Sequence, residues 1–258
     1  MFNCIINLKQ LGYVPDTILD IGAYHGHWTD TMKTIYPDAS YYLFEAIDYP
    51  ELKRFDILSN TFVYNVVLND KIDTVNWYQM KNTGDSMFRE KTQFFNNCEI
   101  TKKDTIDLNT FISSKNICVQ CNSQVCTCES PNITGCDNSN VQSALLNCAH
   151  HILTSSKNIL IKIDCQGAEI PILKGASNIL KNTDFIIMEL PLFGQYNEGV
   201  GSFQDHIIFM DSIGFIPYDI MEKHYVNNFV MQIDMMFINK NHHFNTIVDS
   251  LNNHNNSN

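Results

Sequence analysis

The residues most suited to chemistry form a short turn, Asp20-Ile-Gly22-Ala23-Tyr24-His25-Gly26. Glycines at positions 22 and 26 let the backbone turn sharply and pass close to a ligand. Their spacing, G-x-x-x-G, differs from the G-x-G-x-x-G with which dinucleotide-binding turns hold a pyrophosphate. The carboxylate before the first glycine suits a cofactor that carries an amino-acid ammonium group, and it suits a polyphosphate poorly. The turn therefore predicts a cofactor site of the amino-acid-bearing type.

A second carboxylate, Glu45, ends the next apolar run of the sequence. A carboxylate at this place can accept hydrogen bonds from both hydroxyls of a ribose. An Asp-x-Gly turn or a strand-end glutamate alone is common without a ligand, whereas the two together, in this order, favour cofactor binding. The neighbouring His25 and His27 are interpreted more readily as surface or core residues than as cofactor contacts. The residues expected to hold the cofactor are Asp20, Gly22, Ala23, Gly26 and Glu45.

Four carboxylates, Asp20, Glu45, Asp164 and Glu189, fall at the ends of predicted strands. Ligands of open α/β sheets bind beyond the carboxyl ends of the strands, so the four are expected to line one crevice. A carboxylate there can accept the proton of an alcohol, which is otherwise a poor nucleophile.

Asp164 is the predicted base or acceptor-orienting group, with Lys162 and Glu169 in support. Glu189 either binds the acceptor or faces solvent. An alternative remains open for Asp164, because aspartate is also a good N-cap for the helix that begins near Gly167. Glu169 would then only complement the dipole of that helix.

Apolar runs and turn residues predict the elements that position these side chains. Strands are expected at 17–22, 41–45, 61–68, 158–164, 185–189, 214–220 and 229–239, with a hairpin near 75–80. Helices are expected from the glycine turn to Pro37, and at 51–58, 168–182 and 203–213.

Alternation of strands and helices, followed by two consecutive strands, predicts a mostly parallel sheet with helices on both faces. The fold class is α/β, a class I methyltransferase-like Rossmann fold with an antiparallel C-terminal strand. A single domain is expected over 1–240, with a cysteine-rich insert at about 113–156 and a polar, disordered tail at 241–258.

The sequence resembles the FkbM family of methyltransferases over most of the chain outside the insert and the tail. The most specific segment is IKIDCQGAEIPILKGA at 161–176, because the signature of the family there is Lys-Ile-Asp-Val-Glu-Gly-Ala-Glu followed by Leu-Lys-Gly. Further resemblance lies in the glycine turn, FEA at 44–46, NVVLND at 65–70, TID at 105–107, IIMEL at 186–190 and QIDMMFINK at 232–240.

The resemblance implies an S-adenosylmethionine-dependent methyltransferase that methylates a hydroxyl of a sugar, a glycan or another small compound. Two residues depart from the pattern, since Gln166 stands where the family usually has Glu and Tyr24 where it usually has Asn. Both departures put full activity in doubt and leave the fold unaffected.

The insert concentrates six of the nine cysteines between Cys118 and Cys148. One C-x-x-C pair and one C-x-C pair offer four soft ligands for zinc, Cys118, Cys121, Cys126 and Cys128. Zinc favours four such ligands in a tetrahedron, but a second C-x-x-C is missing. A loose segment with incidental thiols is the simpler interpretation.

Composition restricts the partners. The net charge of −11 and the pI of about 5.1 disfavour nucleic acid, which needs a basic surface. No stretch is long and apolar enough for a membrane span, and the N-terminus lacks the charged start of a signal peptide. A soluble, cytoplasmic protein acting on small molecules is expected.

Three other functions compete with this hypothesis. The first is a catalytically degenerate methyltransferase fold that binds a partner through the cysteine-rich insert, with or without zinc. The second is a nicotinamide oxidoreductase, which the glycine spacing and the closing pair of strands disfavour. The third is an RNA-cap methyltransferase, because Lys162, Asp164 and Glu189 superficially resemble a Lys-Asp-Lys-Glu tetrad, but the acidic balance of the chain opposes it.

Overall fold

The computed structural model describes residues 1–80, 83–114, 156–193 and 197–246. Its strands are β1 Thr17–Ile21, β2 Ser40–Glu45, β3 Thr61–Asn65, β4 Val67–Asn69, β5 Asp73–Gln79, β6 Glu99–Asp107, β7 Ile159–Ile163, β8 Thr183–Pro191, β9 Phe215–Val226 and β10 Phe229–Asn239. The α-helices are α1 Phe2–Gln10, α2 His27–Ile35, α3 Leu108–Ser114, α5 Glu169–Lys174 and α6 Phe203–Ser212. Three short 3-10 helices are η1 Pro50–Phe55, η2 Gln93–Asn97 and η3 Ile179–Asn182.

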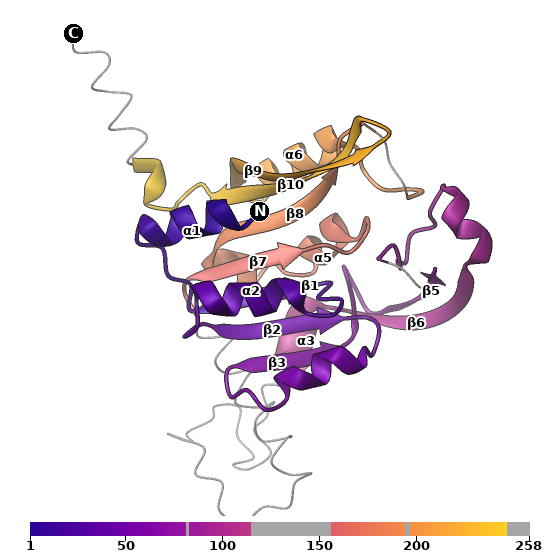
Figure 1. Ribbon diagram of the computed structural model, residues 1–258, viewed down its shortest axis with the longest axis horizontal. Coiled ribbons are helices and arrows are strands. Elements are labelled where there is room, and N and C mark those ends of the chain that lie inside the picture. The colour runs from indigo at the N-terminus through magenta and orange to yellow at the C-terminus, as the bar shows by residue number, and fades with distance from the viewer. Residues whose placement is uncertain (81–82, 115–155, 194–196, 247–258) are drawn as a thin grey trace, which may run out of the picture.

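A seven-stranded sheet in the order β3-β2-β1-β7-β8-β10-β9 forms the centre of the molecule (Figure 1). The first five strands run parallel, and β10 is antiparallel to both β8 and β9. Strands β1 and β7 are buried along their whole length, as apolar runs in a covered parallel sheet should be. The predicted α/β fold, a mostly parallel sheet with an antiparallel C-terminal strand, is confirmed.

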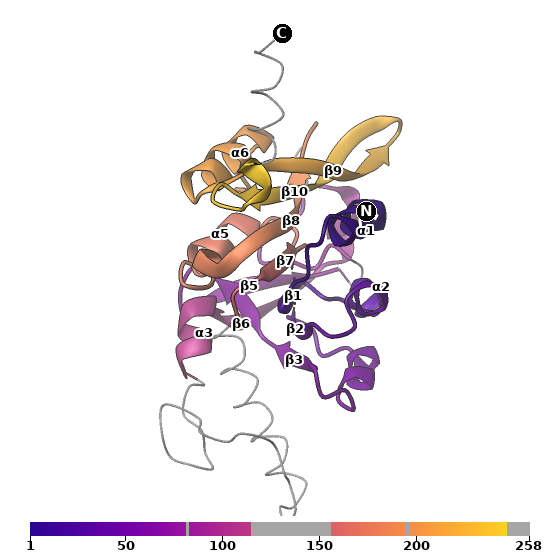
Figure 2. The same ribbon diagram turned by 90° about the vertical axis from the view of Figure 1, so that its left-hand side faces the viewer.

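Helices cover both faces of this sheet, as Figure 2 shows. Helices α1 and α2 lie on one face, where Ile5, Met32 and Phe55 join one apolar cluster. Helices α3, α5 and α6 lie on the other face, where Phe111 and Ile172 join a second cluster. The sheet is therefore held between two apolar layers.

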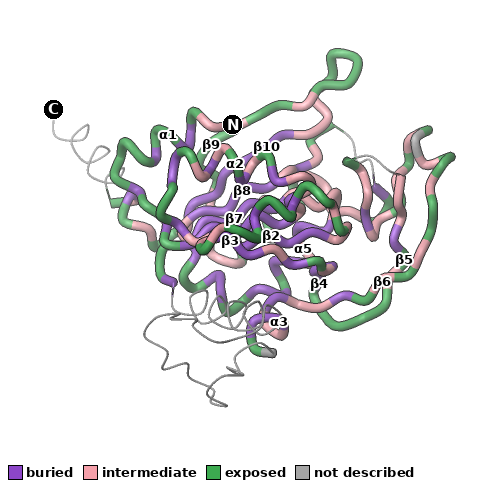
Figure 3. Tube along the Cα trace, turned by 60° about the horizontal axis from the view of Figure 1, so that its bottom comes forward, coloured by how far each residue is buried: buried purple, intermediate pink, exposed green. Residues whose placement is uncertain are grey.

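A second, three-stranded sheet in the order β4-β6-β5 stands at the carboxyl edge of the parallel strands (Figure 1). Its arm of β5 and β6 is mostly exposed or half-buried, in contrast to the buried central strands (Figure 3). The sheet explains two differences from the predicted elements. The predicted strand 61–68 divides at Val66, where the chain leaves β3 and enters β4. The segment near 75–80, which was predicted to form a hairpin, is strand β5, and it pairs with β6 and, through Tyr78, with Ser86.

Four further elements differ from expectation. The predicted helix 168–182 divides into α5, which has Gly175 as its C-cap, and η3. The predicted helix 51–58 is the 3-10 helix η1, and helices α1 and α3 were not predicted. Helix α1 buries Cys4, Ile5 and Leu8, an amphipathic spacing that a nine-residue segment shows only weakly.

The ends of the proposed domain are only partly described. Residues 241–246 of the expected disordered tail have a defined structure, and Phe244 is buried against Phe185. The insert lies outside the described residues between 115 and 155, and so does the rest of the tail from 247. Among the described helices, none has the length and apolar character needed to cross a membrane.

Candidate active site

A cavity of about 820 Å³ opens at the carboxyl edge of the large sheet. Its wall combines the glycine turn after β1, the end of β2, the turn after β7, the end of β8 and the β9–β10 pair, together with residues 83–93 from the second sheet. Volumes of this size are typical of sites for small ligands. The strand ends that the sequence predicted to form a site therefore surround one cavity.

The glycine turn has the geometry that its sequence predicts. Gly22 and Gly26 both have φ of +77°, a left-handed conformation that disfavours side chains. A Cβ at Gly22 would lie 2.0 Å from the carbonyl oxygen of Asp164, and one at Gly26 would lie 2.5 Å from the Phe55 ring. Both positions therefore require glycine.

Tyr24 stands in this turn with φ of +50° and gives the cavity an aromatic side. Its ring stacks on His25 with centroids 3.9 Å apart and meets Tyr49 edge-on at 5.1 Å. Among residues with a side chain, asparagine is one of the most tolerant of this backbone conformation, which fits the residue that the FkbM pattern usually has here. The histidines at 25 and 27, which were expected to be ordinary surface or core residues, line the cavity.

Glu45 lies in the cavity wall at the end of β2 and is 8% exposed. One carboxylate oxygen accepts a hydrogen bond from the backbone N–H of Tyr24 at 2.7 Å, and the other accepts from Ile47 at 3.0 Å. Burial raises the pKa of Glu45, and these backbone donors oppose the shift. Glu45 is thus fixed beside the glycine turn, where the ribose hypothesis needs it.

Asp20 is fully buried behind the turn and is not among the residues that line the cavity. Its carboxylate accepts a hydrogen bond from the Thr29 hydroxyl at 2.7 Å and lies 3.5 Å from Lys162 Nζ. Burial raises the pKa of Asp20, and Lys162 opposes the shift. Asp20 therefore supports the site from beneath, whereas the sequence predicted a direct cofactor contact.

Lys162 links the two halves of the site. Its ammonium lies 3.5 Å from a carboxylate oxygen of Asp20 and 3.5 Å from one of Asp164, and it is 3.4 Å from the carbonyl oxygen of Gly22. Burial lowers the pKa of Lys162, but the two carboxylates outweigh it and hold the pKa above its usual range. Lys162 remains a cation that fixes Asp164 against the glycine turn.

Glu169 closes the turn between β7 and α5. It accepts hydrogen bonds from the backbone N–H groups of Cys165 at 3.0 Å and Gly167 at 3.2 Å, and burial raises its pKa to about 7. The N-cap of α5 is Ala168, with no capping side chain. The alternative in which Asp164 caps this helix is therefore wrong, because the helix begins too late in the chain.

Gln166 joins the carboxylates that end β7 and β8. Its side-chain N–H₂ donates to Asp164 at 3.2 Å and to Glu189 at 3.1 Å, and the amide of Gln232 donates to the same Glu189 oxygen at 2.8 Å. A glutamate at 166 could not donate in this way. The departure from the family pattern thus supplies donors exactly where two acidic groups approach each other.

Glu189 is the most strongly perturbed acid of this cluster. Burial, followed by the charges of Asp164, Glu169 and Asp234, raises its pKa to about 9. Like charges brought together in a buried site favour protonation of one of them. Glu189 is therefore protonated and uncharged at pH 7, so it forms part of the cavity wall without adding a negative charge.

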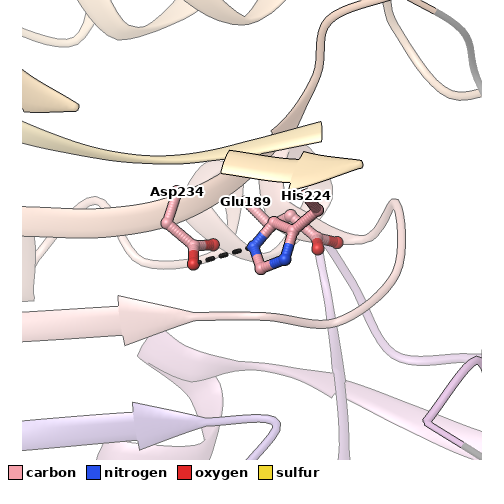
Figure 4. Close-up of side chains that lie close together, drawn as sticks. All are labelled: Glu189, His224 and Asp234. Atoms are coloured by element: carbon pink, nitrogen blue, oxygen red, sulfur yellow. Dashed lines mark hydrogen bonds and ion pairs between the residues drawn. The ribbon is translucent and has the colours of Figure 1, made fainter. Parts of the chain in front are cut away.

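Two residues of the site, His224 on β9 and Asp234 on β10, were missed from the sequence. Figure 4 shows them beside Glu189, with His224 Nε2 3.0 Å from an Asp234 carboxylate oxygen. The alternation of Gln232 and Asp234 along one strand was a usable signal, because residues two apart share a face. Nothing in the sequence marks His224.

Glu189, His224 and Asp234 offer three potential ligand atoms within 4.8 Å of one another. The oxygen that Asp234 presents is engaged by the imidazole, and Glu189 accepts from two amides. We interpret the set as a hydrogen-bonded cluster. The predicted zinc ligands Cys118, Cys121, Cys126 and Cys128 lie outside the described residues.

Residues 131–217 match the methyltransferase FkbM domain family. No curated protein matches the sequence. Among solved structures, a 1,6-didemethyltoxoflavin-N1-methyltransferase from Burkholderia thailandensis is 9% identical and covers 92% of this chain and 76% of its own, with a TM-score of 0.45. A methyltransferase FkbM from Methylobacillus flagellatus KT is 12% identical and covers 86% of this chain and 43% of its own, with a TM-score of 0.43.

The matched segment contains β7, α5 and β8, which are the elements that carry Lys162, Asp164 and Glu189. These are also the elements on which the sequence resemblance depends most. The predicted resemblance to the FkbM family is confirmed over residues 131–217, where the methyltransferase FkbM domain family matches.

Proposed function

We propose that the protein is an S-adenosylmethionine-dependent O-methyltransferase whose acceptor is a sugar, a glycan or another small hydroxyl compound. The observation that carries this proposal is the single cavity bounded by the glycine turn and Glu45 on one side and by Asp164, Glu189 and His224 on the other. A donor and an acceptor bound in one cavity can react without diffusing apart, which supplies much of the rate acceleration.

The cofactor half of the cavity fits S-adenosylmethionine. Gly22, Ala23 and Tyr24 of its turn line the cavity, where a ligand can contact them. Glu45 lies where ribose hydroxyls would donate to it. The indole N–H of Trp77, 6% exposed in the cavity wall, has no hydrogen-bond partner among the described residues. A buried donor of this kind is suited to an acceptor nitrogen of a base.

The acceptor half is polar. S-adenosylmethionine supplies a methyl group on a positively charged sulfur, and an incoming oxygen must approach that group in line. Asp164 is held by Lys162 and Gln166 at the border of the two halves. In this proposal Asp164 orients the acceptor hydroxyl, while Glu189, Gln166 and Gln232 form the wall behind it.

Binding of S-adenosylhomocysteine, measured by calorimetry, tests the cofactor half. Glu45→Gln should weaken binding about 10- to 100-fold, because a hydrogen bond to a charged group contributes about 1.5–3 kcal/mol. Glu51→Gln is the matched control, since Glu51 is exposed on η1 and does not line the cavity. Equal affinity in the wild type and Glu45→Gln would remove Glu45 from the site.

Transfer of a labelled methyl group to a panel of sugars, sugar nucleotides and small phenols tests the reaction. The proposal expects label in at least one hydroxyl compound. Binding of S-adenosylhomocysteine without transfer to any acceptor would instead favour the alternative, a degenerate fold that serves as a binding protein. Metal analysis of purified protein adds a second test, since stoichiometric zinc without binding of the methyl donor would also favour that alternative.

A further inference from the structure

His224 is the one histidine in the acceptor half of the cavity among the described residues. It projects from β9, and its side chain is 38% exposed. The buried carboxylate of Asp234, with 8% of its side chain exposed, lies across the β9–β10 pair and contacts His224 Nε2 at 3.0 Å. The pair joins a buried acid to a ring that reaches the cavity.

This contact fixes the tautomer of the imidazole. A carboxylate only accepts, so Nε2 carries the proton and donates it to Asp234. The lone pair of the ring is then on Nδ1, which has no hydrogen bond to a described residue. An oriented imidazole with its lone pair on the side away from a buried carboxylate is the arrangement that enzymes use to activate hydroxyl groups.

The two acids that line the acceptor half beside His224, Glu189 and Asp164, are less suited to take a proton. Glu189 is already protonated at neutral pH by the effect of its burial and its acidic neighbours. Asp164 has one oxygen beside Lys162 and the other bonded to Gln166, which suits a fixed orienting group. His224 is left as the group in the acceptor half with a lone pair that no described residue engages.

We propose that His224 is the general base of the reaction and that Asp234 is its positioning residue. This inference rests on the proposed O-methyltransferase function. The acceptor hydroxyl gives its proton to Nδ1 of His224 while its oxygen forms a bond to the methyl carbon. The carbon–sulfur bond breaks, its electron pair stays on sulfur, and the positive charge passes from the sulfonium to the imidazolium.

Acidic groups surround the imidazole from each side. Asp234 faces it from β10, Glu189 from β8 and Asp164 from the turn after β7, while Glu222 lies on β9 itself. The hydrogen bond to Asp234 has the largest effect and raises the pKa of His224, and burial opposes it. A base acts in its deprotonated form, so turnover should rise with pH through the pKa of His224 and then level off.

The first test measures the imidazole directly. Nuclear magnetic resonance titration of His224 should give a pKa that falls in Asp234→Asn and falls much less in Glu222→Gln, whose charge acts without a hydrogen bond. Glu222 is the matched control, because it is a nearby carboxylate without a hydrogen bond to the ring. Calorimetry with S-adenosylhomocysteine should show the same affinity in the wild type, His224→Gln and Asp234→Asn, which also shows that the variants fold.

The second test measures transfer of labelled methyl to the sugar that accepts most label in the panel. His224→Gln should lower turnover about 10²- to 10⁴-fold and abolish the rise with pH. Asp234→Asn should lower turnover about tenfold or more, because an asparagine N–H facing Nε2 favours the wrong tautomer. The rise with pH should also shift to lower pH, because the carboxylate that raises the pKa of His224 is lost. Glu222→Gln should keep the wild-type turnover.

Three outcomes would overturn the inference. The first is that His224→Gln keeps the turnover of the wild type, and the second is that Asp234→Asn keeps its pH profile. The third is that chelators abolish turnover and that a divalent metal then restores it only in the wild type. The last would make the cluster a metal centre. Failure of the proposed function looks different, because no acceptor would then be methylated by the wild type at any pH.

Discussion

At the scale of single residues, the site is organised by side-chain hydrogen-bond donors that lie between carboxyl groups. Gln166 is the clearest case, since its one amide group donates to both Asp164 and Glu189. It does so from a backbone with φ of +51°, which a residue other than glycine adopts at a cost of order 1–3 kcal/mol. The two hydrogen bonds offset this strain, so the residue that departs from the family pattern is integrated into the site.

We predict that Gln166→Glu lowers the free energy of unfolding by about 1–3 kcal/mol at pH 8, because it replaces a donor by a third acid. The double variant Gln166→Glu, Glu189→Gln should recover much of this loss, because the glutamine at 189 can donate to the new carboxylate. Urea denaturation measures both. Gln204→Glu, exposed on α6, is the control and should stay within about 0.5 kcal/mol of the wild type. A stable Gln166→Glu variant would mean that the amide donors contribute little.

At the scale of elements, the site depends on two turns that touch. The turn after β1 and the turn after β7 meet where Gly22 faces the carbonyl oxygen of Asp164. Strands β1 and β7 are hydrogen-bonded neighbours in register, so their exits lie side by side. The close contact brings the glycine turn and Asp164 together without any bond between their side chains.

We predict that Gly22→Ala separates these turns. Gly214→Ala is the matched control, because Gly214 also has positive φ, +91°, but a Cβ there would meet nothing within 4 Å. The control should lose about 1–2 kcal/mol of stability from the backbone alone. Gly22→Ala should lose about 1–3 kcal/mol more and should no longer bind S-adenosylhomocysteine in calorimetry. Equal losses and retained binding in both variants would contradict this account.

The elements also show how far a sequence can be interpreted. Apolar runs predicted the parallel strands of the large sheet, because burial on both faces leaves a continuous apolar signal. They also located β9 and β10, although most of β9 is exposed. They did not predict α1, whose nine residues offer too few turns for a clear period, or the separate sheet that β4 joins. That sheet forms by pairing between β4, β5 and β6, which lie up to 40 residues apart and leave no local pattern.

The site was predicted to a similar extent. The predicted residues that line the cavity are Gly22, Ala23, Glu45, Lys162, Asp164 and Glu189, since the ends of parallel strands must meet at one edge. Gly26 does not line it. His224 was missed because it depends on the register of β9 against β10, which includes three shifts that the sequence does not show. Asp20 and Glu169 were recognised as important, but their oxygens are used inside the protein.

At the scale of the whole molecule, acids dominate. The chain has a net charge of −11, and buried acids gather at the carboxyl edge of the sheet with Lys162 as a buried cation among them. Burial raises the pKa of Glu169 to about 7 and, with its acidic neighbours, that of Glu189 to about 9, from ordinary values of 4.5. The folded state therefore binds protons that the unfolded state releases, and stability is coupled to pH.

The sign of this coupling gives the last prediction. Between pH 4.5 and about 9 a protonated Glu189 makes the folded state hold more protons than the unfolded state, so rising pH lowers the free energy of unfolding. Glu189→Gln keeps the shape of the neutral acid and removes its titration. Between pH 7 and 8.5 the variant should lose less stability than the wild type, by up to about 1.4 kcal/mol per pH unit.

Urea denaturation at several pH values measures these slopes, with Glu99→Gln as the control because Glu99 is exposed on β6 and should leave the slope unchanged. Glu169 contributes in the same direction only below about pH 7, so a residual slope in Glu189→Gln should flatten above that value. Parallel curves for wild type and Glu189→Gln would mean that Glu189 is ionised in the folded protein. The cluster around His224 would then carry one more negative charge, which would hold the imidazole protonated to higher pH and shift the methyl-transfer profile with it.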